Sequence, residues 1–187
     1  MRKIIASTLV TLDGIMQDPG GFGETKDGGW AGPYYDEEMG RMFIDGLAAC
    51  DTFLCGEVTY KVLSEAWEGG TGEYLDTLNN MPKLVASTTL QEPLGWNAKL
   101  IKGNVPDEVA KIKQLPGKDI MMYGSATLMA SLAERNLIDI YKVWIYPVIL
   151  GSGKRLFPEG FSKEKLKLID TKTLGSGVVV LTYQSFR

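Results

Sequence analysis

The sequence contains no histidine, and this absence removes whole classes of catalyst. Without an imidazole the chain cannot build a Ser-His-Asp or Cys-His catalytic group, an HExxH zinc site or any histidine general base. An enzyme with this sequence has to use carboxylates, hydroxyls, lysine, cysteine or a bound cofactor that carries the chemistry itself.

Cysteines, basic runs and long apolar runs are also scarce. Cys50 and Cys55 lie five residues apart with no His or further Cys beside them, so we expect two reduced, buried thiols and no metal site. No basic run exceeds two residues and the net charge is −3, which argues against nucleic acid as a partner. No apolar run approaches the roughly 18 residues of a membrane span. Because Asp13 interrupts the short apolar run at the amino terminus, we read that run as a strand and expect a cytoplasmic protein.

Glycine, in contrast, is abundant, at 22 of 187 residues. Each glycine inside a regular element costs roughly 0.5–1 kcal/mol relative to alanine. This many glycines therefore indicate special turns or a close approach of the backbone to a ligand. The length and the absence of a linker predict a single domain over residues 1–187.

Apolar runs alternate with helical patterns through the first two thirds of the chain. We expect strands at 3–10, 52–55, 83–87, 99–102 and 119–123, and helices at 36–49, 57–66, 106–115 and 125–136. Three β-type runs follow, at 139–149, 166–173 and 178–186. The pattern predicts an α/β fold with a mostly parallel sheet and an antiparallel C-terminal edge. Residues 17–35 form a long glycine- and aromatic-rich loop, typical of lids, binding loops or disordered segments.

Two strands end in the same way, with glycine, two residues, threonine and then a helix. The turns are Gly56-x-x-Thr59 and Gly124-x-x-Thr127. Glycine lets an anion approach the backbone, and the helix N-terminus and the threonine hydroxyl supply donors. Two such turns at the carboxyl ends of one parallel sheet suit a ligand with separated phosphates, such as a dinucleotide. The alternative is that these residues are ordinary loop and capping residues.

Five segments together resemble a known family. They are STLVTLDG (7–14), FLCGEVTYKVL (53–63), KLVASTTL (83–90), MYGSATLMASLAERNLID (122–139) and PVILGSGKRLF (147–157). The chain resembles the dihydrofolate-reductase-like superfamily, in the branch of the C-terminal reductase domain of bacterial riboflavin-biosynthesis proteins. The resemblance implies a three-layer α/β fold with a central sheet of about eight strands. It also implies NADPH as hydride donor, a small heterocyclic substrate and a homodimer.

The resemblance further implies which residues meet the cofactor. They are Gly56, Thr59, Ser87, Thr88, Thr89, Gly124, Ser125, Ala126, Thr127, Gly151 and Gly153. The family often carries Arg after the first glycine, where it can pair with a 2′-phosphate, but this chain has Glu57. The choice between NADPH and NADH is therefore open. Ser125 replaces the second glycine of the family's usual pair and still permits close approach.

Hydride transfer also requires a proton, and the sequence offers Asp36 and Asp13 as donors. Asp36 can instead cap the helix that follows it, and Asp13 can fix a turn with Gly14. Three aromatic residues of the long loop can stack on a heterocyclic substrate or pack the loop itself; they are Trp30, Tyr34 and Tyr35.

We expect an NAD(P)H-dependent reductase of a pterin-like or pyrimidine-like heterocycle. The alternative is a dimeric nucleotide-binding protein of the same fold without efficient reductase activity.

The tetrapeptide LGSG occurs twice, at 150–153 and 174–177. The second copy joins two β-type runs, which predicts a turn. We expect the first copy, which follows a long strand, to turn the chain beside the ligand site. The alternative is that both are simple turns.

Overall fold

The computed structural model describes residues 1–186, which form one eight-stranded sheet in the order β4-β3-β2-β5-β1-β6-β8-β7. The strands are β1 (Ile4–Thr11), β2 (Cys50–Gly56), β3 (Lys83–Ala86), β4 (Ala98–Leu100), β5 (Asp119–Tyr123), β6 (Ile140–Tyr146), β7 (Leu166–Thr173) and β8 (Val179–Ser185). The helices are α1 (Glu37–Ala48), α2 (Glu57–Trp67), α3 (Glu73–Asn80), α4 (Val105–Gln114) and α5 (Ala126–Ala133), with a 3-10 turn at Gly32–Tyr34. Strands β1 to β6 run parallel, and β8 and β7 add the antiparallel edge. This confirms the predicted fold class.

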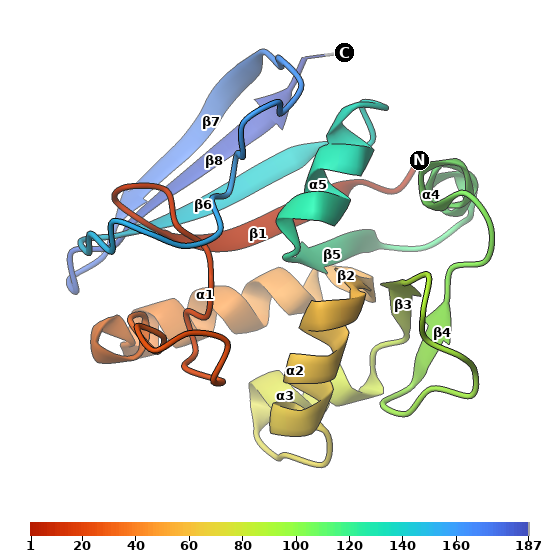
Figure 1. Cartoon of the computed structure of the whole chain (residues 1–187), viewed down its shortest axis with the longest axis horizontal. Helices are drawn as coiled ribbons and strands as arrows, with labels where there is room; N and C mark the ends of the chain where they lie inside the picture. Colours follow the sequence, from red (N-terminus) through yellow and green to blue (C-terminus); the bar gives the residue numbers. More distant parts are fainter. Residues whose placement is uncertain (187) are drawn as a thin grey trace.

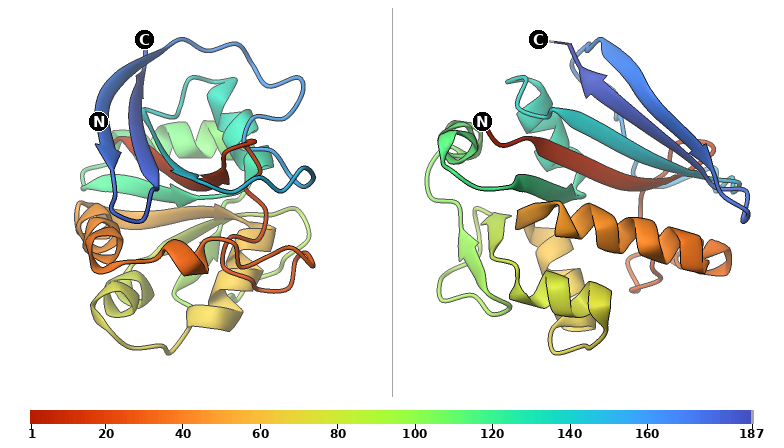
Figure 2. Two further views of the ribbon diagram at one scale, coloured as in Figure 1. Left: turned by 90° about the vertical axis from the view of Figure 1, so that its left-hand side faces the viewer. Right: turned by 180° about the vertical axis from the view of Figure 1, so that it is seen from behind.

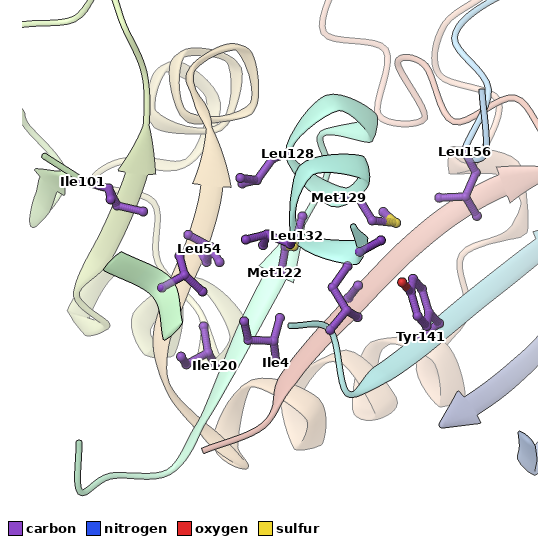
Figure 3. Packing of buried hydrophobic residues seen from close by; sticks show 14 of the residues in the cluster. Ile4, Leu54, Ile101, Ile120, Met122, Leu128, Met129, Leu132, Tyr141 and Leu156 are labelled. Atoms are coloured by element: carbon purple, nitrogen blue, oxygen red, sulfur yellow. The ribbon is translucent and has the colours of Figure 1, made fainter. Parts of the chain in front are cut away.

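Helices cover both faces of the sheet because the parallel strands are apolar on both sides. Alternate residues of β1 point to opposite faces: Ile4 packs in the cluster under α4 and α5, and Ile5 packs against the cluster under α1, α2 and α3. Figure 3 shows the first cluster, in which Leu128, Met129 and Leu132 of α5 face the strands. The three layers match the expected architecture, and α1 and α5 lie on opposite sides of β1 in Figure 1.

Helix α3 is the one helix of residues 1–186 that the sequence pattern did not predict. It begins after Gly72, which has φ 116° and no side-chain cap. It is only eight residues long and shows a brief apolar spacing at Tyr74, Leu75 and Leu78. A helix this short draws its stability from packing, and Leu78 is fully buried against the sheet.

The chain reverses its winding direction between β5 and β1. From β1 the chain crosses through α1 to β2, on one side, whereas from β5 it crosses through α5 to β6, on the other. Such a switch point opens a crevice at the carboxyl ends of the strands, where α/β proteins bind ligands. Strand β1 also extends beyond the carboxyl end of β5. Ser7 pairs with Tyr123, the last residue of β5, and β1 continues to Thr11. Figure 2 shows this edge of the sheet from two further directions.

Candidate functional site

A cavity of about 950 Å³ opens at the carboxyl ends of β1 and β5, at the switch point. Its walls come from β1, the long loop, α1, α2, α3, the turn into α5 and the segment around 154–158. Of the residues predicted for the site, the cavity is lined by Tyr35, Thr59, Gly124, Ser125, Ala126 and Thr127. The other predicted residues lie outside the lining, and their positions are described below.

The two glycine-threonine turns touch each other at this cavity. A Cβ atom on Gly124 would lie 2.8 Å from Oγ1 of Thr59, and one on Gly56 would lie 2.9 Å from Oγ of Ser125. Both contacts are closer than real Cβ atoms approach, so the turns interlock only because both positions are glycine. Gly124 also has φ 47°, and its peptide bond to Ser125 is cis. The N-termini of α2 and α5 therefore meet at one place.

The two helix N-termini differ in how their first N–H groups are satisfied. Ser125 caps α5, and its hydroxyl accepts a hydrogen bond from the N–H of Leu128 at 3.3 Å. Helix α2 starts after Gly56, which offers no side-chain cap. The first turn of α2 thus presents backbone donors and the positive end of the helix dipole toward the cavity side of the sheet.

An aromatic wall closes the side of the cavity formed by α1, α2 and α3. Its rings meet edge to face: Trp67 lies 6.0 Å from Phe22 and 5.8 Å from Tyr74, centroid to centroid, and Phe43 lies 6.3 Å from Tyr74. Such a wall suits a flat, apolar ring. The hydroxyl of Tyr74 donates to that of Tyr123 at 3.2 Å. Burial raises the pKa of Tyr123 to about 12 and that of Tyr74 well above its usual range, so both phenols stay neutral.

Thr8 is a buried hydroxyl without a partner in this cavity. It is 5% exposed, it lines the cavity, and its Oγ1 has no hydrogen-bond partner among the described residues. Its side chain shares a face of β1 with Ala6 and Val10, which pack under α5. Leaving such a group unpaired costs about 1–3 kcal/mol, so a ligand that hydrogen-bonds to Thr8 removes a penalty already present.

These features fit a nicotinamide dinucleotide. The interlocked glycines and the two helix N-termini suit a pyrophosphate. The orphaned Thr8 hydroxyl suits the carboxamide of a nicotinamide ring, which both donates and accepts hydrogen bonds. The aromatic wall, on the side of the cavity away from Thr8, suits a second flat ring.

The predicted proton donors, Asp36 and Asp13, both hold structural positions outside the cavity lining. The carboxylate of Asp36 accepts a hydrogen bond from the N–H of Met39 at 2.7 Å and so caps α1. Asp13 accepts from the hydroxyl of Thr11 at 2.6 Å and from the N–H of Gly151 at 2.8 Å. These bonds, the Thr11 one first, hold the pKa of Asp13 at about 2. A catalytic role for either residue stays a prediction.

Trp30 and Tyr34 pack the loop, whereas Tyr35 reaches the cavity. Nε1 of Trp30 donates to the carbonyl of Gln17 at 2.9 Å, and both Trp30 and Tyr34 contact the ring of Tyr146 edge to face. The hydroxyl of Tyr35 lies where a side chain on Gly40 would begin, 2.3 Å from an ideal Cβ. Of the three predicted aromatic residues, only Tyr35 lines the cavity.

The two LGSG segments have different surroundings, and contact of Gly151 and Gly153 with a cofactor stays a prediction. The second is the turn between β7 and β8, where the N–H of Leu174 donates to Val178 and that of Gly177 donates back to Leu174, both at 2.9 Å. The first is held against the end of β1 by the bonds from Leu150 and Gly151 to Asp13. Gly151 and Gly153 do not line the cavity. Lys154 and Arg155, immediately after them, do line it and are its cations.

The hydroxyls of Ser87 and Thr89 both donate hydrogen bonds to Glu57. The carboxylate of Glu57 accepts from the Ser87 hydroxyl at 2.5 Å, from the Thr89 hydroxyl at 2.6 Å and from Nζ of Lys61 at 2.6 Å. The Lys61 bond, followed by those of the two hydroxyls, lowers the pKa of Glu57 to about 2. Thr88 is exposed beside them.

Sequence reasoning missed Thr8, the aromatic wall and the pair Lys154-Arg155. Thr8 and the two cations lie inside segments that carry the resemblance. Nothing in the sequence nevertheless indicated that their side chains would line a cavity. The wall joins residues from the long loop, α1, α2 and α3, which no local pattern connects.

Cys50 and Cys55 are both buried and free, as expected, and burial raises the pKa of each thiol to about 12. Within residues 1–186 no group of three or more acidic or Cys side chains is placed to hold a metal ion. The same residues contain no helix that is both long and apolar enough to cross a membrane.

Comparison with known proteins agrees with this fold. The uncharacterized protein YyaP of Bacillus subtilis (strain 168) is 34% identical over 194 residues, with 97% of this chain and 94% of that protein covered. A putative riboflavin biosynthesis protein from Shewanella sp. PV-4 has a similar structure, with a TM-score of 0.77, 21% identity and both chains fully covered. Dihydrofolate reductase from Enterococcus faecalis, solved with NADP(H), gives a TM-score of 0.62 at 13% identity, with coverage of 99% and 97%. The model of the RibD C-terminal domain matches residues 2–180, and the chain therefore belongs to the RibD C-terminal domain family.

Proposed function

We propose that the protein is an NAD(P)H-dependent reductase that transfers a hydride to a small pterin-like or pyrimidine-like heterocycle. The observation that carries the proposal is the meeting of two helix N-termini and an orphaned buried hydroxyl at one large cavity. The fold relative that was solved with NADP(H) supports the choice of cofactor.

A dinucleotide bound there supplies the hydride from its reduced nicotinamide ring. The chain's own residues would position it: the first turns of α2 and α5 would hold the pyrophosphate, and Thr8, on the α5 side of β1, would hydrogen-bond to the carboxamide of the ring. The opposite half of the cavity, lined by Phe43, Tyr74 and Trp67, would hold the ring of the substrate.

Tyr35 is our proposed proton donor. Its hydroxyl lies over Gly40 at the start of α1, on the side of the cavity that would hold the substrate. A tyrosine hydroxyl can serve as a general acid in hydride transfer. Lys154 and Arg155 place positive charge at the cavity and would stabilise an anion that develops on the substrate ring.

The second candidate function is nucleotide binding without efficient turnover, in a homodimer. It is favoured by one observation: both carboxylates predicted as proton donors are committed to structural hydrogen bonds outside the cavity lining. A protein of this kind would bind the dinucleotide and lack a competent acid.

One pair of measurements separates the two functions. We expect calorimetry to show saturable binding of NADH or NADPH at micromolar concentration. We further expect the nucleotide to be oxidised when dihydropterins or aminopyrimidinones are added. Binding without oxidation of either nucleotide across that panel would favour the second function, and no binding at millimolar concentration would remove both.

A further inference from the structure

We infer that Glu57 makes this protein prefer NADH over NADPH. The inference rests on the proposed function, because it concerns how the same site reads the far end of the dinucleotide. The sequence places Ser87, Thr88 and Thr89 among the expected cofactor-binding residues and leaves the choice between NADPH and NADH open.

The order of strands fixes where the far end lies. In the proposed binding mode the reduced ring would occupy the crevice between β1 and β5, and the pyrophosphate would lie over the turns after β5 and β2, which meet at Gly56 and Gly124. The next strand outward is β3, about 4.8 Å beyond β2. An extended dinucleotide therefore brings its adenosine ribose over the ends of β2 and β3, where Glu57 and Ser87 meet.

At this place the structure already holds an anion in a ring of donors. Two hydroxyls and one ammonium group, from Ser87, Thr89 and Lys61, converge on the single carboxylate of Glu57 within 2.5–2.8 Å. Three donors to one anionic group is the coordination that a bound phosphate would require. In this protein the carboxylate of Glu57 accepts these hydrogen bonds in place of a phosphate.

A 2′-phosphate would have to displace Glu57 or sit beside it. Lys61 gives it no net attraction, because the Lys61 charge is already matched by the carboxylate at 2.6 Å. A ribose 2′-hydroxyl, in contrast, is attracted to Glu57, because it can donate a hydrogen bond to a carboxylate oxygen. An acidic side chain that accepts from the ribose hydroxyl is the usual basis of NAD selectivity in dinucleotide-binding folds.

The test compares NADH and NADPH binding by calorimetry in the wild type, Glu57→Gln and Glu57→Arg. We expect the wild type to bind NADH at least tenfold more tightly than NADPH. Glu57→Gln keeps the size of the side chain and removes its charge, so the preference should fall to within about threefold. Glu57→Arg should reverse it. Glu65→Gln removes the same charge two turns further along α2 and should leave the wild-type ratio unchanged.

The outcomes separate this inference from the proposed function. Equal or tighter binding of NADPH by the wild type overturns the role of Glu57 while the reductase proposal stands. A wild-type preference for NADH that Glu57→Gln leaves intact also overturns it, because another residue must then read the ribose. Absence of binding for both nucleotides would contradict the proposed function and this inference together.

Discussion

Thr8 and Thr11 are two buried threonines of β1 whose hydroxyls differ in their hydrogen bonding. The hydroxyl of Thr11 donates to Asp13 at 2.6 Å and accepts from the N–H of Ile15 at 2.9 Å. The hydroxyl of Thr8 has no such partner in the described chain and faces the cavity. A buried polar group left unpaired lowers stability unless something else supplies the bond, and binding sites are where such groups collect.

Replacing Thr8 by valine should therefore separate stability from binding. We expect Thr8→Val to leave the free energy of unfolding unchanged or to raise it. The substitution replaces an unpaired hydroxyl by a methyl group of the same shape. Dinucleotide affinity should fall by about 0.5–1.5 kcal/mol, the net value of one hydrogen bond. Denaturant unfolding and calorimetry measure the two quantities.

Thr11→Val is the matched control. It removes two hydrogen bonds of a buried group and should cost about 1–3 kcal/mol of stability while affinity stays the same. If Thr8→Val lowers stability as Thr11→Val does and leaves affinity unchanged, the Thr8 hydroxyl has no ligand to bind.

The proton donor can be identified by two substitutions at neighbouring positions. Tyr35→Phe removes only the hydroxyl over Gly40 and should lower kcat by roughly 10²-fold with little change in KM for the dinucleotide. Asp36→Ser keeps a side chain that caps α1 and removes the carboxylate, so activity and melting temperature should both remain near wild type. A large loss of kcat in Asp36→Ser, with Tyr35→Phe unaffected, would assign the proton to Asp36 instead.

Helices α2 and α5 act through their first turns, which meet only because Gly56 and Gly124 lack side chains. The sequence predicted both turns because each strand, glycine and helix is a local pattern. It did not predict that they touch, since Gly56 and Gly124 lie far apart in the chain. The contacts of Glu57 with Ser87 and Thr89 were not predicted for the same reason, because these two hydroxyls follow β3 and lie far from Glu57 in the chain. Helix α3 was missed because it combines a length of only eight residues and a brief apolar spacing with the lack of a side-chain cap.

Adding a charge to the first turn of α5 should change its stability and its binding in opposite directions. Thr127→Asp places an acid near a helix N-terminus, which favours the helix by about 0.3–1 kcal/mol. The same carboxylate repels a pyrophosphate, so dinucleotide affinity should fall by at least tenfold. Thr127→Ser keeps the hydroxyl without the charge and should bind as the wild type does. A Thr127→Asp variant that binds with unchanged affinity would place the pyrophosphate elsewhere.

At the scale of the whole molecule, the cavity results from the sheet topology, which reverses the winding direction between β5 and β1. The fold class and the antiparallel edge were predicted from the sequence, because hydrophobic periodicity and the succession of strands and helices along the chain are local patterns, as in residues 119–136. Which acids and aromatics face the cavity depends on the path of loop 17–35. That path is set by Asp18, a buried carboxylate that accepts from the N–H groups of Phe22 and Thr25. No pattern in the sequence fixes such a path, so the sequence did not show that Asp36 lies outside the cavity lining.

A crystal structure of the protein with NADH tests the central claim most directly. We predict the pyrophosphate over the first turns of α2 and α5, and the nicotinamide carboxamide hydrogen-bonded to Oγ1 of Thr8. The adenosine ribose should lie beside Glu57. A dinucleotide bound at any other surface, or one whose nicotinamide ring lies outside the crevice between β1 and β5, would contradict the account.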